Sequence, residues 1–268
     1  MLASVRLMPR SPSDSLSPHL PVSPSESQTG GRGDGETGGT EQSQHSLISV
    51  IVPIKNERPA VADRFCRLAK SPDVELLVAD TGDDPETTRA FEAIGAKLVA
   101  GSGNRGARLA RAASAARGDI LLFIHSDSDL PREALSAVRE TLAGAATAGA
   151  FSLGYRDADL RMRWIAWWAN QRSRRLGLPF GDQGIFCQRN AYENAGGIRS
   201  FPICDDVDFV RRLKRGGTLV IRPEKTLTSP RRYRERGALR QVLRTWRVLA
   251  GYFLGVSPER LDRWYNGR

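Results

Sequence analysis

The stretch that most constrains this chain is residues 118–131, where an apolar run stops abruptly at a cluster of polar side chains. Residues 120–124 are rich in β-formers and contain no polar residue, which predicts a strand buried on both faces. The strand is followed directly by His125, Ser126, Asp127, Ser128 and Asp129. Open parallel sheets bind ligands at the carboxyl ends of their strands, so this cluster predicts a ligand site. A polar turn that caps the helix after Pro131 is the competing interpretation, and this stretch alone leaves both open.

Asp127 and Asp129 are candidate metal ligands. Hard carboxylate oxygens spaced this closely suit Mg²⁺ or Mn²⁺, and either ion can hold a diphosphate. The sequence therefore predicts a divalent-cation site at the end of this strand.

The first half of the folded region predicts an α/β fold. Apolar runs alternate with amphipathic segments, which indicates a parallel sheet with right-handed crossovers. The predicted strands are 47–53, 75–79, 96–100 and 120–124, and the predicted helices are 60–70, 86–94 and 107–116. Polar residues follow three of the strands, namely Asn56 with Glu57, Asp80, and Asp127. Three such ends on one sheet edge predict a ligand crevice.

A glycine-rich loop at residues 101–106 matches the spacing of a dinucleotide-binding motif. The match follows the third strand rather than the first, and no acidic residue closes the next strand at the required distance. We therefore interpret these glycines as an ordinary loop.

The second half departs from simple alternation and ends in a helical part. Strands are predicted at 148–155, 185–188 and 218–222, and the main helices at 132–142, 157–176, 209–215 and 239–252. Asp205, Asp206 and Asp208 precede one of these helices, where helix capping and catalysis are both open. Arg231, Arg232 and Arg234 are expected in a loop where they could meet phosphate. For the tryptophans of residues 157–176, core packing is favoured over a membrane interface.

Composition separates the chain into two parts. Residues 1–46 are rich in Ser, Pro and Gly without apolar periodicity, so we expect a disordered tail before a folded domain at 47–268.

The net charge of +10 favours polyanionic or phosphorylated partners. Three scattered cysteines argue against a disulfide framework and fit a cytoplasmic protein. The longest apolar run, 248–256, is too short to span a bilayer.

Taken together, these residues resemble the family 2 glycosyltransferases of GT-A fold, most specifically the radical-SAM/selenodomain-associated subgroup. The resemblance covers about residues 48–265. It rests on the strand 49–53 with Asn56 and Glu57, on Asp80, on 116–123 with His125 and Asp127, on 181–183, on Asp205 with Asp206, on 211–214 and on 252–256. The order and spacing of these pieces make the resemblance specific.

The resemblance implies an α/β GT-A enzyme that moves a sugar, with inversion, from a nucleotide-diphosphate donor to an acceptor hydroxyl. It implies Asp206 as general base beside Asp205, Asp127 as the metal ligand, and Gly181, Asp182 and Gln183 around the donor sugar and acceptor. Donor-binding residues would be Pro53, Asn56, Glu57, Asp80, Arg105, Asp127, Arg231, Arg232 and Arg234. The metal would be Mg²⁺ or Mn²⁺, and Asp129 is the second candidate for a metal ligand after Asp127.

The chain departs from the family at several positions. His125 stands where common members carry Asp, although the subgroup also has His, and Asp205 replaces a Glu. Arg108, Ala110 and Ala112 stand where the subgroup carries Gln, Asn and Gly, so donor contacts from that helix are in doubt.

Two other functions stay open from the sequence: a nucleotidyltransferase of related fold, and a non-catalytic basic protein that binds a membrane surface or nucleic acid. We do not expect nucleic acid to be a partner. The sequence does not decide whether the acceptor is a lipid or a small molecule. It also leaves open a peripheral contact with the inner face of the membrane.

Overall fold

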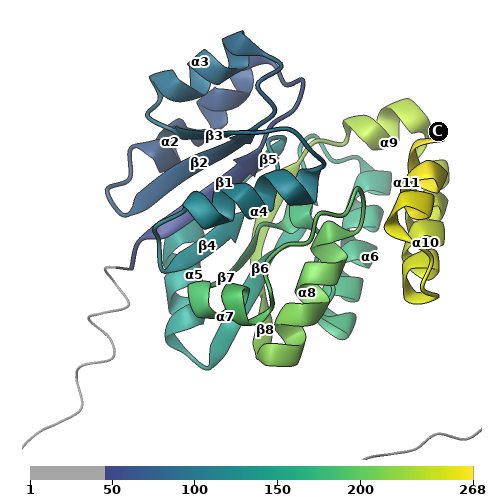
Figure 1. Ribbon diagram of the computed structural model, residues 1–268. Helices are drawn as coiled ribbons and strands as arrows, with labels where there is room; N and C mark the ends of the chain where they lie inside the picture. The colour runs from purple at the N-terminus through teal and green to yellow at the C-terminus, as the bar shows by residue number, and fades with distance from the viewer. Residues whose placement is uncertain (1–45, 268) are drawn as a thin grey trace, which may run out of the picture. The chain divides into compact units, whose positions relative to one another are not determined.

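An eight-stranded mixed sheet runs through the centre of the protein (Figure 1). The computed structural model describes residues 46–267. The strand order is β3-β2-β1-β4-β7-β6-β8-β5. The predicted tail at 1–46 lies, apart from Ser46, outside the described residues.

The first half of the sheet is parallel, as the alternating sequence pattern predicts. Strand β1 is flanked by β2 and β4, and β3 pairs with the outer edge of β2. The strands are β1 (Ile48–Pro53), β2 (Val74–Asp80), β3 (Lys97–Ala100) and β4 (Ile120–Phe123). The crossovers contain η1 (Pro59–Phe65), α2 (Cys66–Ala69), α3 (Pro85–Ala93) and α4 (Arg105–Ala115). One crossover differs from the expected helix 60–70, because it begins as a 3₁₀ helix and only its last turn is α-helical.

The alternation along β1 places the core on both faces of the sheet. Val50 and Val52 pack into one apolar cluster with Phe91 and Phe186, whereas Ile51 packs into a second cluster with Phe209. Helices cover both faces, and the carboxyl ends of the parallel strands are left free to form a site.

The second half of the sheet introduces antiparallel strands. Strand β7 (Ile185–Gln188) runs antiparallel to both β4 and β6 (Ala146–Tyr155), whereas β6 and β8 (Thr218–Thr228) are parallel. The two-residue β5 (Ser128–Asp129) pairs with the end of β8. Strand β8 therefore continues past its predicted end at Arg222 and reaches the polar cluster after β4. The helical elements here are α5 (Ala134–Ala143), α6 (Leu160–Leu176), η2 (Gly181–Gln183), α7 (Arg189–Asn194) and α8 (Asp205–Gly216).

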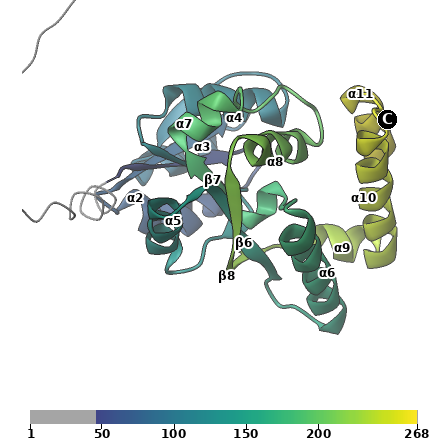
Figure 2. The same ribbon diagram turned by 90° about the horizontal axis from the view of Figure 1, so that it is seen from below.

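The C-terminal part is helical, as predicted. It consists of α9 (Arg231–Arg236), α10 (Ala238–Phe253) and α11 (Pro258–Asn266). Figure 2 shows α10 standing to one side of the sheet, with α9 between it and α6. Leu261 of α11 packs with Val248 and Leu249 of α10 and with Val207 of α8, which attaches this part to the rest of the domain.

Two expectations about this region are wrong. Arg231, Arg232 and Arg234 lie in helix α9 rather than in a loop. The tryptophans of α6 do not pack in the core: Trp164, Trp167 and Trp168 are 60%, 50% and 48% exposed. The reason is that α6 turns a different stripe, Met162, Ile165 and Ala166, toward β6, and this leaves the tryptophans on its outer side.

Among residues 46–267, no helix has both the length and the hydropathy that a membrane span requires.

Candidate active site

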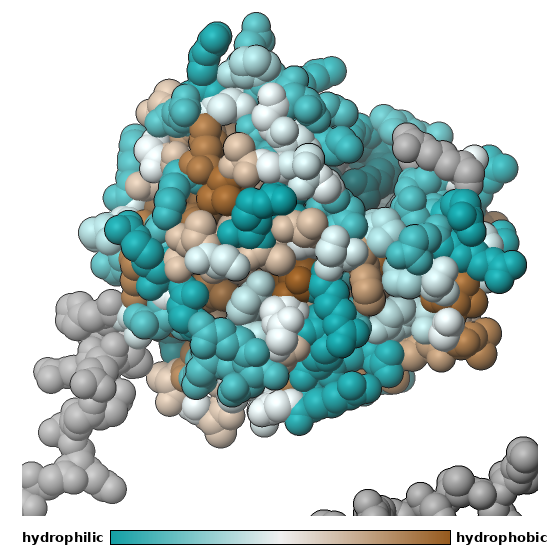
Figure 3. All heavy atoms as spheres, in the orientation of Figure 1, coloured by the Kyte–Doolittle hydropathy of each residue, from teal (hydrophilic) through white to brown (hydrophobic). Residues whose placement is uncertain are grey.

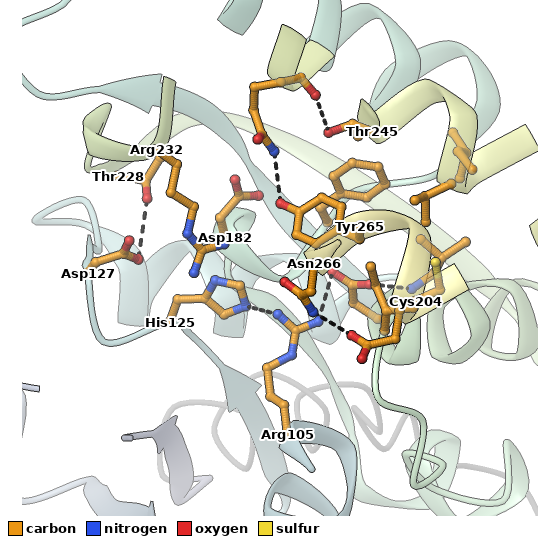
Figure 4. Close-up of a pocket in the computed structure, with 18 of the residues that line it drawn as sticks. Arg105, His125, Asp127, Asp182, Cys204, Thr228, Arg232, Thr245, Tyr265 and Asn266 are labelled. Atoms are coloured by element: carbon orange, nitrogen blue, oxygen red, sulfur yellow. Dashed lines mark hydrogen bonds and ion pairs between the residues drawn. The ribbon is translucent and has the colours of Figure 1, made fainter. Parts of the chain in front are cut away.

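A cavity of about 290 Å³ lies where the polar strand ends meet α8 and the C-terminal helices. Figure 4 shows His125, Asp127, Asp182 and Arg232 on one side, with Arg105 below and Tyr265 and Asn266 of α11 opposite. A second, more polar cavity of about 480 Å³ adjoins it and shares Arg105, His125, Asp127 and Arg232 in its lining. The first cavity is referred to below as the catalytic pocket and the second as the polar cavity.

Asp127 lies in the lining of both cavities, as its position after β4 predicts. The hydroxyl of Thr228, at the end of β8, donates to Oδ1 of Asp127 over 3.5 Å. Arg156 donates to the backbone carbonyl of Asp127 over 2.7 Å. The pairing of β5 with β8 thus holds this carboxylate at the mouth of the pocket.

Asp129 is placed differently from Asp127. Its carboxylate forms ion pairs with Arg64, at 2.9 Å, and with Arg156. It is not among the described residues that line either cavity. Two arginines satisfy this carboxylate, so its geometry does not favour the reserve role of metal ligand.

Arg105, the first residue of α4, connects three of the predicted site residues. Its guanidinium donates to both oxygens of Asp205, and the Nη2 atom lies 3.6 Å from Oδ2 of Asp206. Nη1 of Arg105 lies 3.0 Å from Nε2 of His125, which therefore accepts. Burial and the positive charge of Arg105 lower the pKa of His125 to about 4, so the imidazole is neutral at physiological pH.

Asp206 projects into the catalytic pocket from the first turn of α8. The backbone N–H groups of Gly181 and Val207 each donate to its carboxylate over 2.8 Å. Burial opposes ionisation, but Arg105 and the Gly181 N–H outweigh that cost and lower the pKa of Asp206. Asp206 is therefore an ionised carboxylate that faces the cavity.

The three aspartates of α8 have separate partners, and none of them caps the helix. The N-cap is Cys204, which has a left-handed backbone (φ 60°), and α8 begins at Asp205 rather than at the predicted Phe209. Asp205 is only 1% exposed and is bound by Arg105, so it positions that arginine instead of facing the pocket. Asp208 pairs with Arg212 at 2.7 Å and accepts from Tyr252.

Asp182 is the least satisfied carboxylate of the site. Its Oδ1 is buried and receives no hydrogen bond from any described residue. Burial raises the pKa of Asp182 to about 6, and the nearby Arg172 only partly opposes this. A buried oxygen without a donor, on a carboxylate that lines the pocket, is suited to a ligand hydroxyl.

Other predicted residues divide between the cavities and the framework. Pro53, Asn56, Glu57, Arg231 and Arg232 line the polar cavity. Asp80 is engaged locally, since its carboxylate accepts from the Gly82 N–H and from the Thr88 hydroxyl. Gln183 is fully buried and donates to the Phe151 carbonyl, so it supports the loop around η2 rather than the pocket. Arg234 donates to the Asp157 carbonyl, away from both cavities.

Several lining residues were not predicted from the sequence. Tyr155, Phe180 and Tyr233 line the pocket on the side of α6, and Tyr265 and Asn266 line it from α11. Helix α11 itself was detectable, because Ser257 caps it, Pro258 occupies its first position and Glu259 its first turn. The aromatic residues carried no such signal, since tyrosines in strands and helices usually pack in cores.

Residues 49–195 match the family described as Glycosyl transferase family 2. The chain belongs to this family. No curated protein matches it by sequence.

Solved structures show that this family 2 member has the GT-A fold. A mannosyltransferase from Pyrobaculum calidifontis, in complex with GDP-Man and Mn²⁺, aligns with a TM-score of 0.57 and 19% identity over 76% of this chain and 61% of the other. S. aureus TarS, in complex with UDP-GlcNAc, aligns with a TM-score of 0.52 and 16% identity over 68% and 58%. Glucosyl-3-phosphoglycerate synthase from Mycobacterium tuberculosis aligns with a TM-score of 0.50 and 21% identity over 80% and 84%. The chain thus spans less than two thirds of the first two chains.

The side chains present fit a divalent cation only as partial ligands. Within the described part of the chain, no three His, Cys, Asp or Glu side chains gather closely enough to hold a metal by themselves. Of the described residues that line both cavities, Asp127 is the one with a carboxylate. This arrangement suits a cation that takes its other ligands from a bound diphosphate.

Proposed function

We propose that this family 2 protein transfers a sugar, with inversion, from a nucleotide-diphosphate donor to an acceptor hydroxyl. The observation that carries the proposal is that Asp127 and Asp206 line the same pocket. Asp127 follows the end of β4, and Asp206 lies on the first turn of α8. Inverting transfer requires a leaving diphosphate on one side of the sugar and a base on the other. The comparisons support this class, because the similar structures include complexes with GDP-Man and UDP-GlcNAc.

The donor nucleotide is assigned to the polar cavity. Pro53, Asn56 and Glu57 would surround the base and ribose, and Arg231 and Arg232 would face the diphosphate. Asp80 would act by holding the end of β2, because its own oxygens are already bonded. Arg234, bonded to Asp157, is no longer a proposed donor contact.

Asp127 is the proposed ligand for Mg²⁺ or Mn²⁺. A cation bound there would neutralise charge on the departing diphosphate. Arg232 would add a positive charge from α9 on the same side of the pocket.

Asp206 is the proposed general base, with Asp205 acting through Arg105. As the acceptor oxygen attacks the anomeric carbon, the bond from that carbon to the diphosphate oxygen breaks and the hydroxyl proton moves to Asp206. The lowered pKa of Asp206 keeps it ionised, and the ionised carboxylate is the form that can take a proton. Gly181 holds Asp206 through its N–H, and Asp182 would bind a hydroxyl of the sugar or the acceptor.

The remaining assignments are part of the same proposal. Residues 47–268 would carry the activity without residues 1–46, and the motif pattern supports placement in the radical-SAM/selenodomain-associated subgroup. The three free cysteines support a cytoplasmic location.

The proposal is tested by screening nucleotide-diphosphate sugars for an increase in melting temperature with Mn²⁺, since a ligand of the native state raises it. We expect at least one nucleotide sugar to raise it by several degrees with Mn²⁺ and by less with EDTA. A panel in which no nucleotide sugar has an effect would contradict the proposed function.

A further inference from the structure

The exposed large apolar side chains gather on two helices that flank the catalytic pocket. Among the described residues, all of them except Leu227 lie on α6, or on α10 and its C-cap residue Leu254. They are Leu160, Trp164, Trp167, Trp168 and Leu176 on α6, and Leu239, Leu243, Trp246 and Phe253 on α10. Figure 3 shows brown, apolar side chains at the edge of the molecule where α10 lies in Figure 1. Such concentration in one place marks a binding surface rather than scattered exposure.

A groove of about 270 Å³ runs between these two helices. Its walls are mainly aromatic and aliphatic, with Trp164, Ile165 and Trp168 from α6 and Val242, Trp246 and Leu249 from α10. Trp164 and Trp246 are both more than half exposed, so the walls are open to a ligand from outside.

The groove adjoins the catalytic pocket. Tyr155, Phe180, Asp182 and Tyr233 line both cavities. A molecule that lies along the groove therefore ends beside the unsatisfied Asp182, in the same pocket as Asp206. This shared lining favours a substrate over a partner that covers only the outer surface.

The charges around the groove favour a lipid over a second copy of the chain. Neither α6 nor α10 contains an acidic residue, whereas together they carry Arg161, Arg163, Arg172, Arg174, Arg175, Arg240, Arg244 and Arg247. Two such surfaces would repel each other, but both would be attracted to anionic lipid phosphates. Exposed tryptophans beside arginines are typical of helices at a membrane interface.

We propose that the acceptor is an amphipathic lipid whose hydrocarbon chain occupies the groove between α6 and α10. Its head group then carries the acceptor hydroxyl into the catalytic pocket. This inference rests on the proposed sugar transfer, and the reacting bonds are those given above, with the lipid hydroxyl as nucleophile and the nucleoside diphosphate as leaving group. The chain in the groove fixes the acceptor, while Asp206 takes the proton.

The test uses the full chain and two soluble probes, dodecylglycerol below its critical micelle concentration and butylglycerol. Calorimetry should show that dodecylglycerol binds with a Kd at least about a hundredfold lower, because each buried methylene favours binding by about fourfold. Equal affinities for the two probes would overturn the proposal.

Two neighbouring tryptophans supply a matched pair of variants. Trp168 lines the groove, whereas Trp167 is equally exposed and is not among the described residues that line it. Trp168→Ser should weaken dodecylglycerol binding by about tenfold, and Trp167→Ser should leave it within about twofold. Equal losses in both would indicate adhesion to the outer surface and would overturn the groove assignment.

The acceptor role is separated from the proposed function by measuring donor binding and consumption in parallel. For a nucleotide sugar that raises the melting temperature, dodecylglycerol near its Kd should raise the rate of donor consumption, whereas butylglycerol at the same concentration should not. Donor binding without any effect of dodecylglycerol would leave the sugar transfer standing and overturn the lipid acceptor. Dodecylglycerol binding without any nucleotide-sugar binding would overturn the acceptor role together with the proposed function.

Two other occupants would be recognised in the same experiments. A dimer that Trp168→Ser dissociates, seen by sedimentation, would assign the groove to a second copy. Dodecylglycerol binding that appears only after removal of residues 1–45 would assign it to that segment. Either result would overturn the lipid proposal.

Discussion

The backbone N–H of Gly181 donates a 2.8 Å hydrogen bond to Oδ2 of Asp206 and so joins the loop before β7 to the first turn of α8. A side chain at position 181 would disturb this contact, because an added Cβ would lie 2.6 Å from Nε2 of His125 and 3.3 Å from the same Asp206 oxygen. This contact fixes the orientation of the Asp206 carboxylate, which points into the pocket.

Asp206→Asn should lower turnover by about 10²-fold or more while the fold and donor affinity stay unchanged. The amide oxygen can still accept from the Gly181 N–H, and only the bond from the Val207 N–H at the helix end is lost. The amide cannot take the acceptor proton. Turnover at saturating donor and donor-induced melting shifts would be measured together, since a missing base acts on the chemical step. Turnover within a few-fold of wild type would remove Asp206 from the mechanism.

Asp205→Asn should act on stability rather than on chemistry. The change removes the nearer of the two carboxylates beside Arg105, the one that accepts from it through both oxygens, in a site where Asp205 is almost fully buried, and leaves only Asp206 at 3.6 Å. We expect a loss of about 3 kcal/mol in the free energy of unfolding, measured in urea. Asp206→Asn provides the comparison, and equal stability of the two variants would contradict the separate roles.

Asp127→Ala and Asp129→Ala form a matched pair for the metal. Asp127 lines both cavities, whereas Asp129 is paired with Arg64 and Arg156. The first variant should lose the Mn²⁺-dependent part of nucleotide-sugar binding, seen as a melting shift that EDTA no longer reduces. The second should keep it. The reverse result would move the metal assignment to Asp129.

Asp182→Asn should stabilise the protein in a pH-dependent way. The pKa of Asp182 is raised from 3.8 to about 6, so the folded chain holds this proton more tightly than the unfolded chain. The stability gained from this proton is complete below about pH 4 and is lost as the pH rises through about 6. At about pH 7.5 the variant should therefore be more stable than wild type by up to about 3 kcal/mol, and at about pH 4 the difference should vanish.

Thermal unfolding across this pH range would measure the effect of Asp182→Asn. The exposed Asp83, changed to Asn, is the control and should give no such trend. A constant difference between Asp182→Asn and wild type at every pH would show that the effect is not due to the proton.

Removal of residues 1–46 should leave the melting temperature and any sugar transfer nearly unchanged. The reason is compositional, because this segment contains too little apolar sequence to pack against the domain. A fall of several degrees in the melting temperature of the truncated chain would contradict the domain assignment.

Much of the fold was predictable because each parallel strand carries its own signal. Residues 120–124 are apolar throughout and are followed by polar residues, and in the structure residues 120–123 form a buried strand beside β1. The antiparallel strand β7 was predicted as a strand, but its direction depends on contacts with β4 and β6 that no local pattern encodes.

The place of Asp127 in the pocket was predictable, because this residue follows the end of a buried strand. Position alone could not single out Asp206, because Asp205 and Asp208 lie in the same first turn of α8 and do not line the pocket. Only the family resemblance favoured Asp206. Gln183 was misjudged because its side chain turns inward to the Phe151 carbonyl, and a polar residue in a loop can face either way. The Trp residues of α6 were misjudged for a similar reason, since periodicity gives the faces of a helix but not which face meets the sheet.

The position of the tryptophans has a practical consequence for spectroscopy. All five, Trp164, Trp167, Trp168, Trp246 and Trp264, lie on α6, α10 or α11, and none lies in the central sheet. Intrinsic tryptophan fluorescence of this protein therefore reports on the C-terminal helices and α6, and it contains little direct information about the sheet. A fluorescence transition on heating or in urea would follow the loosening of these helices, and circular dichroism is needed to follow the unfolding of the sheet.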